Sequence, residues 1–304
     1  MKLQSVVIKT WIISILLCAN AQARETLAVI YPDVRSPFDQ IFAEIIEGID
    51  QEYGSDIRLR SLKKSDNPDQ AIKWLRNESA DMLIALGGRG YKVAKLIHKD
   101  KPVAIGALPI RPNGISGISL LAEPRVLFET LKELAPNITN VHVVYSPRSR
   151  WLINIAQEQA SVLGLSLNNI EVKSKKAAVQ IYEQMLRNID PSKDAVWLPL
   201  DNVSADEQVI LPNLLEKSWE QNLVLFSSKP EHAKRGALFS MFPDHEALGR
   251  QLVKMVTKMY QSKQEEGVVP LQKMKLAVNL RTAAHLGFDY KNQQKSQFHL
   301  TFPQ

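Results

Sequence analysis

Short apolar runs alternate along this chain with longer stretches in which apolar side chains recur at helical spacing. Up to residue 107, four runs have the pattern of strands: the apolar runs 25–31, 82–86 and 101–107, and the alternating run 56–62. Between the first two runs, six apolar side chains fall on one face of a helix: Phe38, Ile41, Phe42, Ile45, Ile46 and Ile49. A second helix is expected at 68–77 and a third directly after residue 86. This order predicts a parallel sheet with helices on both faces.

The alternation stops once and then starts again. Pro109, Pro112 and the Asn113-Gly114 pair interrupt it, so we interpret the small extended segment 114–120 as a connection between two lobes. Beyond it, further strands are expected at 140–145, 166–172, 194–198, 223–226, 237–242 and 273–279. The intervening helices are expected at 124–134, 150–163, 177–188, 207–220, 245–262 and 281–286. The sequence therefore predicts an α/β protein with two Rossmann-like lobes, followed by a polar, loosely held tail at 291–304.

The first 23 residues have the three parts of a secretory signal peptide. Lys2 and Lys9 precede a short apolar run at 11–19. The motif Ala21-Gln22-Ala23 that follows, with alanine at both ends, has the form of a cleavage site. The run is too short to span a bilayer. We therefore predict cleavage after Ala23 and a periplasmic product, with an uncleaved anchor as the alternative. Lipidation of Cys18 is less favoured, because Leu17 precedes it where a small residue is needed.

Charge and motif searches exclude several classes of function. The net charge is +6, but the basic residues are dispersed, so no nucleic-acid partner is expected. Cys18, in the signal, is the only cysteine, so the mature chain has no disulfide. There is no G-x-S-x-G, H-E-x-x-H or Walker motif, and the six histidines lack ligand spacing. We therefore expect no cofactor, no metal site and no enzymatic activity.

A glycine turn after the strand at 82–86 is the first candidate binding element. Gly87, Gly88 and Arg89 open the following helix, where free backbone N–H groups and a guanidinium can hold a carboxylate or phosphate. The spacing only loosely matches a dinucleotide fingerprint, and no partner acid stands near residue 105. The alternative is that the glycines simply permit a tight turn.

Other candidates follow the carboxyl ends of strands, where open α/β sheets bind ligands. Asp201 can hold a ligand ammonium beside Asn202, or it can cap the next turn. Tyr145, Ser146 and Ser149 can grip a carboxylate, although Ser149 is equally a plain N-cap. The remaining candidates are Asp33, Ser36, Ser227 and Phe239, with Trp151 as an open position for ring stacking. Ser36 also has the position of an N-cap, and Phe239 has the character of a core residue.

Six stretches, taken in order, carry a family resemblance: PDVRSPFDQIFAEIIEGI, NGISGIS, VHVVYSPRS, DAVWLPLDN, GALFSMFPDHEALGRQLVKM and LAVNLRTAAHLGF. Together they resemble the substrate-binding proteins of the tryptophan/tyrosine-type ABC transporter family, which have the type I periplasmic-binding-protein fold. The resemblance covers essentially the whole mature chain. It implies capture of a small solute, often an amino acid, between two hinged lobes and its delivery to a membrane permease.

The resemblance also implies three crossings between the lobes, near 109–120, 228–242 and 267–275. We therefore expect a first lobe of 24–113 plus about 243–268, and a second lobe of 114–242 plus about 269–290. Arg89 and Arg111 stand where the family usually has a hydroxyl residue and an acidic-proline pair. If both point inward, they favour a more acidic or anionic solute.

Alternative functions remain open at this stage. A sensory protein that signals to a membrane receptor would bind solute in the same way. An exported enzyme would use the same cleft with a buried acid–base pair, and a degenerate pair of lobes would act as a protein-interaction module without a ligand. A monomer is expected in each case.

Overall fold

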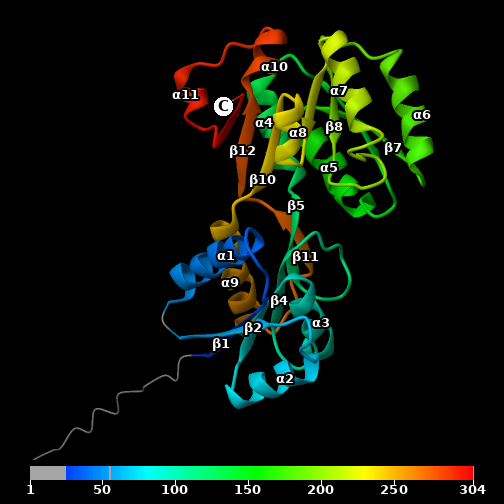
Figure 1. Cartoon of the computed structure of the whole chain (residues 1–304). Helices are drawn as coiled ribbons and strands as arrows, with labels where there is room; N and C mark the ends of the chain where they lie inside the picture. Colours follow the sequence, from blue (N-terminus) through cyan, green and yellow to red (C-terminus); the bar gives the residue numbers. More distant parts are fainter. Residues whose placement is uncertain (1–24, 55, 304) are drawn as a thin grey trace, which may run out of the picture.

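The computed structural model describes residues 25–54 and 56–303 and divides them into two α/β lobes (Figure 1). The predicted signal peptide, residues 1–23, lies outside the described residues. Within the described part, none of the helices combines the length and the apolar character that crossing a membrane requires. The α/β fold class and the two Rossmann-like lobes predicted from the sequence are confirmed.

The first lobe, at the bottom of Figure 1, is built on a six-stranded sheet in which every pairing is parallel. In spatial order its strands are β11 (Val268–Leu271), β5 (Gly117–Ala122), β4 (Val103–Leu108), β3 (Met82–Leu86), β1 (Leu27–Pro32) and β2 (Ile57–Leu62). Its helices are α1 (Phe38–Tyr53), α2 (Pro68–Asn77), α3 (Gly87–Ile97) and α9 (His245–Ser262). Each sheet face has its own apolar core: α1 and α9 cover one face, and α2 and α3 cover the other.

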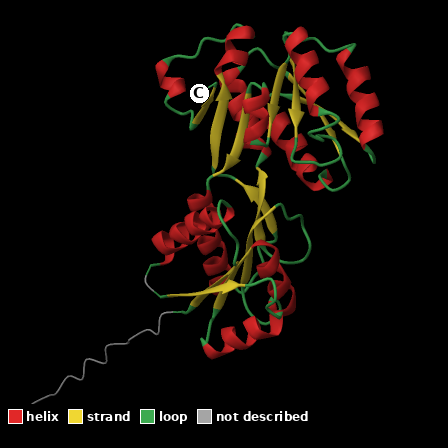
Figure 2. Ribbon diagram, viewed as in Figure 1, coloured by secondary structure: helices red, strands yellow, loops and turns green. Residues whose placement is uncertain are grey.

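The second lobe has a seven-stranded sheet flanked by helices (Figure 2). In spatial order its strands are β13 (Leu300–Phe302), β12 (Met274–Asn279), β10 (Phe239–Pro243), β9 (Val224–Ser227), β8 (Asp194–Leu198), β6 (Asn140–Tyr145) and β7 (Ser166–Glu171). Only β10 and β12 pair in antiparallel fashion among its described strands. The helices are α4 (Pro124–Leu134), α5 (Arg150–Val162), α6 (Lys175–Leu186), α7 (Leu211–Glu220), α8 (Pro230–Arg235), α10 (Leu280–His285) and α11 (Asn292–Lys295).

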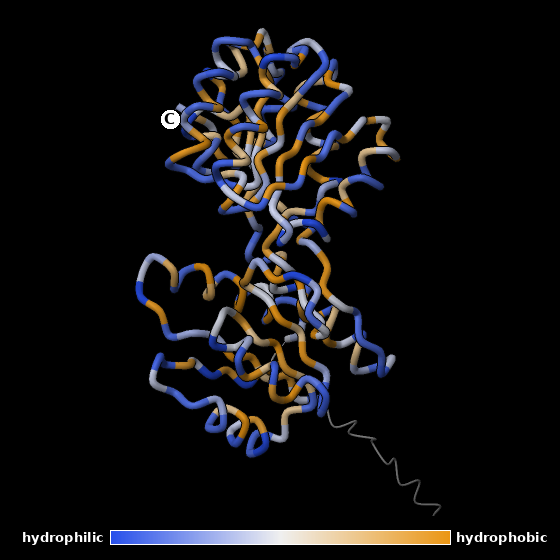
Figure 3. Tube along the Cα trace, turned by 90° about the vertical axis from the view of Figure 1, so that its right-hand side faces the viewer, coloured by the Kyte–Doolittle hydropathy of each residue, from blue (hydrophilic) through white to orange (hydrophobic). Residues whose placement is uncertain are grey.

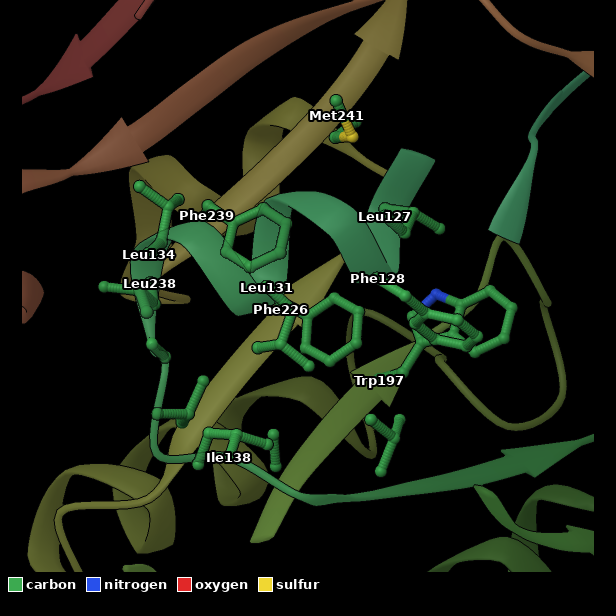
Figure 4. Close-up of a cluster of buried hydrophobic side chains, with 14 of the residues drawn as sticks. Leu127, Phe128, Leu131, Leu134, Ile138, Trp197, Phe226, Leu238, Phe239 and Met241 are labelled. Carbon is green, nitrogen blue, oxygen red and sulfur yellow. The ribbon is translucent and has the colours of Figure 1, made fainter. Parts of the chain in front are cut away.

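An aromatic row forms the centre of the second lobe (Figure 4). The rings of Phe128 and Trp197 meet edge to face with their centroids 5.7 Å apart, and the rings of Phe226 and Phe239 stack with their centroids 5.1 Å apart. All four side chains are fully buried. The row joins α4 to three neighbouring strands of this lobe, β8, β9 and β10.

The two lobes are joined through a narrow waist, seen best in the hydropathy view of Figure 3. The chain passes the waist three times: between β5 and α4, between β10 and α9, and between β11 and β12. Adjacent crossings are tied by backbone hydrogen bonds: the N–H of Glu123 donates to the carbonyl of Leu271 at 2.9 Å, and that of Asp244 to the carbonyl of Lys273 at 3.3 Å. A joint of three short segments suits hinge motion of the lobes.

The structure moves the expected lobe boundaries. Segment 114–120, interpreted as a connection, contains most of β5, which pairs with β4 and β11 inside the first sheet. The first lobe therefore continues to Ala122 instead of ending at residue 113. Segment 228–242, interpreted as the second crossing, forms α8 and most of β10 within the second lobe. Small residues and glycines at 114–120 suggested a turn, but Ile115 and Ile118 are buried there.

The tail is also more ordered than expected. Residues 300–302 form β13, which pairs with β12 at the sheet edge. His299 exchanges two hydrogen bonds with the backbone of Leu276, and Phe298 packs on the lobe core. The polar run at 291–297 hid the alternation of Phe298, Leu300 and Phe302, which is the pattern of a short strand.

Candidate functional site

A cavity of about 470 Å³ opens between the lobes and takes its walls from both of them. The first lobe contributes Tyr91 of α3 and the loop that follows β4. The second contributes the loops that follow β6 and β8, together with the start of α5. The lining residues are Tyr91, Pro109, Ile110, Arg111, Asn113, Leu121, Ser146, Arg148, Ser149, Trp151, Leu200, Asp201, Asn202 and Val203. The volume suits a small molecule, and the position at the carboxyl ends of strands is the usual one for a ligand.

A larger cavity of about 590 Å³ lies elsewhere on the second lobe, among α7, α8, α10 and β13. Every residue that lines it comes from that lobe alone. Lobe closure therefore cannot enclose a ligand there. The cavity between the lobes is therefore the candidate functional site.

Asp201 is the structural centre of the second-lobe wall. Its Oδ2 accepts hydrogen bonds from the N–H of Ser146 at 2.9 Å, from the Ser146 hydroxyl at 2.6 Å and from the Ser149 hydroxyl at 2.7 Å. Its Oδ1 accepts from the N–H groups of Val203 at 2.9 Å and Ser204 at 3.2 Å. A carboxylate offers about four lone-pair positions, and these five donors occupy them. The geometry thus favours the turn-capping role over direct contact with a ligand ammonium.

These bonds also fix the charge of Asp201. Burial by itself would raise the pKa of the carboxyl group, but the hydrogen bonds from Ser146, Ser149 and Val203 outweigh it and hold the pKa below its usual value. Asp201 is therefore ionised at neutral pH. Its hydrogen bonds connect the loop after β6 to the loop after β8 and so hold these two parts of the cleft wall in a fixed position.

The glycine turn has a different role from the one expected. Arg89 donates through one guanidinium nitrogen to the carbonyls of Asp33 at 2.7 Å and Leu62 at 2.6 Å, and it lines a small groove within the first lobe. Gly87 has φ +65°, and a Cβ there would press on Pro32, so this glycine serves the tight turn. Neither Gly87, Gly88 nor Arg89 lines the cavity between the lobes.

Replacing Arg89 with glutamine should therefore lower the free energy of unfolding without changing ligand affinity. Two charge-assisted bonds to carbonyls are lost, which we expect to cost about 1.5–3 kcal/mol. Chemical denaturation measures the first quantity and calorimetric titration the second. A fall in affinity with unchanged stability would return Arg89 to the binding site.

The other first-lobe candidates and three in the second lobe also lie outside the cavity lining. Asp33 and Ser36 are exposed in the loop after β1, and α1 begins at Phe38 without a side-chain cap. The hydroxyl of Tyr145 donates to Asn169 at 3.4 Å, within the second lobe. Phe239 is fully buried in the aromatic row, as the core reading proposed. Ser146, Ser149, Asp201 and Asn202 do line the cavity.

Ser227 forms part of a serine–histidine pair. Its Oγ lies 2.7 Å from Nδ1 of His232, whose Nε2 is 4.0 Å from Glu207. Both Ser227 and His232 have no exposed surface, so a substrate cannot reach the hydroxyl. Burial, with the neighbouring Lys229, lowers the pKa of His232 to about 4 and keeps the ring neutral. The pair therefore supports the fold and does not resemble an accessible catalytic triad.

Tyr91 and Arg148 are the most informative of the lining residues that sequence reasoning missed. Tyr91 lies about one helical turn after Gly87 and Gly88 in α3. In the sequence, nothing distinguished it from an aromatic residue on an ordinary helix surface. Arg148 sits between two residues that were identified, Ser146 and Ser149. Its place in the same strand-end loop was the available signal.

Comparison with known proteins agrees with this architecture. A family model described as "ABC transporter substrate binding protein" matches residues 45–296. No curated protein matches the chain.

Two solved structures show the likeness in fold. The ligand-free, open structure of CD0873, a substrate-binding protein with adhesive properties from Clostridium difficile, has a TM-score of 0.61 and 17% identity, covering 91% of this chain and 99% of that one. An ABC domain in complex with L-Trp from Streptococcus pneumonia has a TM-score of 0.53 and 19% identity, covering 91% and 100%. At these identities the likeness concerns the fold, which is that of type I periplasmic binding proteins.

Proposed function

Because the chain belongs to the ABC transporter substrate-binding protein family, we propose that it captures a small polar or anionic solute, amino acids included, and delivers it to an ABC permease. The observation that carries this proposal is a cavity with walls from both lobes. A ligand held there touches both lobes at once and stabilises the closed arrangement more than the open one. The family is one of binding proteins, so the chemistry of the cleft serves recognition.

The joint between the lobes supports the same function. Three short crossings are the kind of joint about which two lobes can rotate as bodies. Each lobe has its own main apolar core, and these cores meet only near the crossings, where Leu121, Ala122 and Met274 lie. We further propose that the protein acts in the periplasm as a monomer, after removal of residues 1–23. The permease then recognises the closed form.

A thermal-shift screen of the chain from Arg24 to Gln304 tests the proposal. The panel contains amino acids, nucleosides and small organic and inorganic anions. A true ligand at a hundred times its Kd contributes about 2.7 kcal/mol to stability and raises Tm by several degrees. Small-angle scattering should then show a smaller radius of gyration with that ligand. If nothing in the panel shifts Tm or the radius, the proposed function is wrong.

A further inference from the structure

We propose that the cleft selects its solute by negative charge, and that the solute is an aromatic anion held between Arg111 of the first lobe and Arg148 of the second. This proposal rests on the proposed function and specifies the class of solute. It differs from the expectation drawn from the sequence, because Arg89 is directed elsewhere and Arg148 takes its place. It also disfavours an ordinary amino acid.

The two arginines stand on opposite walls of one cavity. Arg111 belongs to the loop after β4, and Arg148 to the loop after β6. Both are exposed, and neither has a carboxylate or carbonyl partner among the residues that the structure describes. A guanidinium binds carboxylate or phosphate oxygens through two parallel N–H groups, so each wall presents a ready anion clamp.

Other groups near the arginines also donate hydrogen bonds. The indole Nε1 of Trp151 has no hydrogen-bond partner within the described part of the chain, but it is covered in this arrangement, so it can donate to a solute only after the side chain turns. The backbone N–H groups of Arg150 and Trp151, in the first turn of α5, are likewise unpaired among the described residues. Asn113 uses its oxygen to accept from Ile115, which leaves its amide N–H₂ free to donate. Donors and the positive end of a helix dipole together favour an anion.

The cleft offers no comparable site for a ligand ammonium. Asp201 is the only acidic side chain among the described residues that line it. Its carboxylate already accepts five hydrogen bonds from Ser146, Ser149, Val203 and Ser204. An amino acid would bring its ammonium into a cleft with two unpaired cations and no free carboxylate. The ammonium group would therefore lower the affinity of the amino acid, because it is repelled by the arginines and finds no carboxylate partner.

The apolar part of the lining is suited to a ring. Tyr91 comes from the first lobe, and Trp151 comes from the second; both are half-buried. Ile110 and Leu200 add aliphatic surface from the two sides. A flat apolar body can lie against these side chains while its charged end reaches the arginines, which is the usual division of roles in a small-molecule site.

The position of the charges also couples binding to closure. Without ligand, bringing Arg111 and Arg148 together places like charges on approaching walls, which opposes closure. A bound anion neutralises this repulsion and bridges the two guanidinium groups. Negative charge on the solute therefore favours the closed state directly.

A series of compounds that share one phenyl ring tests the choice of charge. Calorimetric titration would compare phenylsuccinate, 3-phenylpropionate, phenylalanine and phenethylamine, which carry two negative charges, one, a balanced pair and one positive charge. We expect 3-phenylpropionate to bind at least tenfold more tightly than phenylalanine, and phenethylamine to bind most weakly. If phenylalanine binds as tightly as 3-phenylpropionate or more so, the inference is overturned. It is equally overturned if the broader panel yields a neutral or cationic ligand while no anion binds.

Two variants test the residues, with a matched control. Arg111→Gln and Arg148→Gln should each weaken anion binding about tenfold and abolish the anion-induced decrease in the radius of gyration. Arg187→Gln removes an exposed arginine outside the cleft and should change neither. Equal affinities in all three variants and the wild type would overturn the assignment while leaving solute binding intact. Absence of any ligand in the broad screen would instead reject the proposed function, and this inference with it.

Discussion

Replacing Gly249 with alanine is expected to destabilise the first lobe by about 3 kcal/mol, at the upper end of typical overpacking. Gly249 in α9 and Gly48 in α1 are buried where the two helices cross. A Cβ on Gly249 would come within 3 Å of the Ile45 carbonyl oxygen, and a Cβ on Gly48 would do the same at the Glu246 carbonyl. Backbone cannot rotate away as a side chain can. The helices must therefore separate, which opens the core between them.

Urea unfolding followed by circular dichroism measures the effect, with Gly88→Ala as the control. Gly88 lies in α3 with φ in the ordinary range, and a Cβ there meets nothing within 4 Å. Alanine at Gly88 should leave stability unchanged or raise it by up to about 1 kcal/mol, because alanine favours helix. It should also leave ligand affinity unchanged, although the sequence made Gly88 a binding candidate. Similar losses for the two variants would show that the crossing is not tightly packed.

The helix crossing also shows how the chain builds its hinge. α9 follows β10 of the second lobe, yet its apolar face packs with α1 on the first sheet. β11 then joins the first sheet before the chain returns as β12. The first lobe is thus completed by α9 and β11, which follow the second-lobe strands in the sequence. Loosening the crossing should therefore disturb the joint as well as the core.

The sequence predicted most elements because their burial follows simple periodicity. Strand β3 is apolar at every position and buried on both sides, and α9 carries a clear apolar stripe. Both patterns are readable without knowledge of neighbours. The fold class followed from their alternation and is confirmed.

What the sequence could not supply was strand order. β5 is short, rich in small residues and flanked by turn formers, so its place beside β4 is decided by pairing partners far along the chain. The same holds for β13, which depends on β12. Without strand order, the loop of the first lobe that faces the second could not be chosen. The first-lobe candidates were therefore placed at β1 and β3, whereas the cavity uses the loop after β4 and Tyr91 of α3.

In the second lobe, the rule that ligand groups follow strand ends selected loops that line the cavity between the lobes. It brought Ser146, Ser149 and Asp201 together before any geometry was known. It could not decide between holding a ligand and holding the loops, because that depends on hydrogen bonds between segments that lie about fifty residues apart in sequence. The five hydrogen bonds that Asp201 accepts indicate that it holds the two loops together.

Replacing Asp201 with asparagine should accordingly lower both stability and affinity. An amide has one acceptor oxygen, and its N–H₂ would face donors that now point at Oδ2 from Ser146 and Ser149. The variant loses charge-assisted bonds and leaves buried donors unpaired, which we expect to cost about 3–5 kcal/mol. The loops after β6 and β8 then separate, and we expect anion binding to fall by tenfold or more because the cleft wall changes shape. Urea unfolding and calorimetric titration measure the two effects.

Asp190→Asn is the matched control. Asp190 is exposed and accepts from Ser192 through one oxygen only, from the N–H at 3.1 Å and the hydroxyl at 2.7 Å. Asparagine keeps such an oxygen, so this change should cost less than about 1 kcal/mol. If Asp190→Asn and Asp201→Asn lower the free energy of unfolding by the same amount, the five hydrogen bonds to Asp201 do not contribute more to stability than the two to Asp190.

The pH dependence separates the charge of Asp201 from its shape. Its pKa in the folded protein lies below the value of about 3.9 in the unfolded chain, because the hydrogen bonds outweigh burial. Its ionised form therefore stabilises the fold fully at pH values above about 4. The contribution is lost as the pH falls through the lower, folded pKa. The difference in unfolding free energy between wild type and Asp201→Asn should be constant from pH 5 to pH 7 and should shrink below pH 4. A difference that stayed constant into acid would mean that asparagine fails for steric reasons, and that the charge of Asp201 does not hold the two loops.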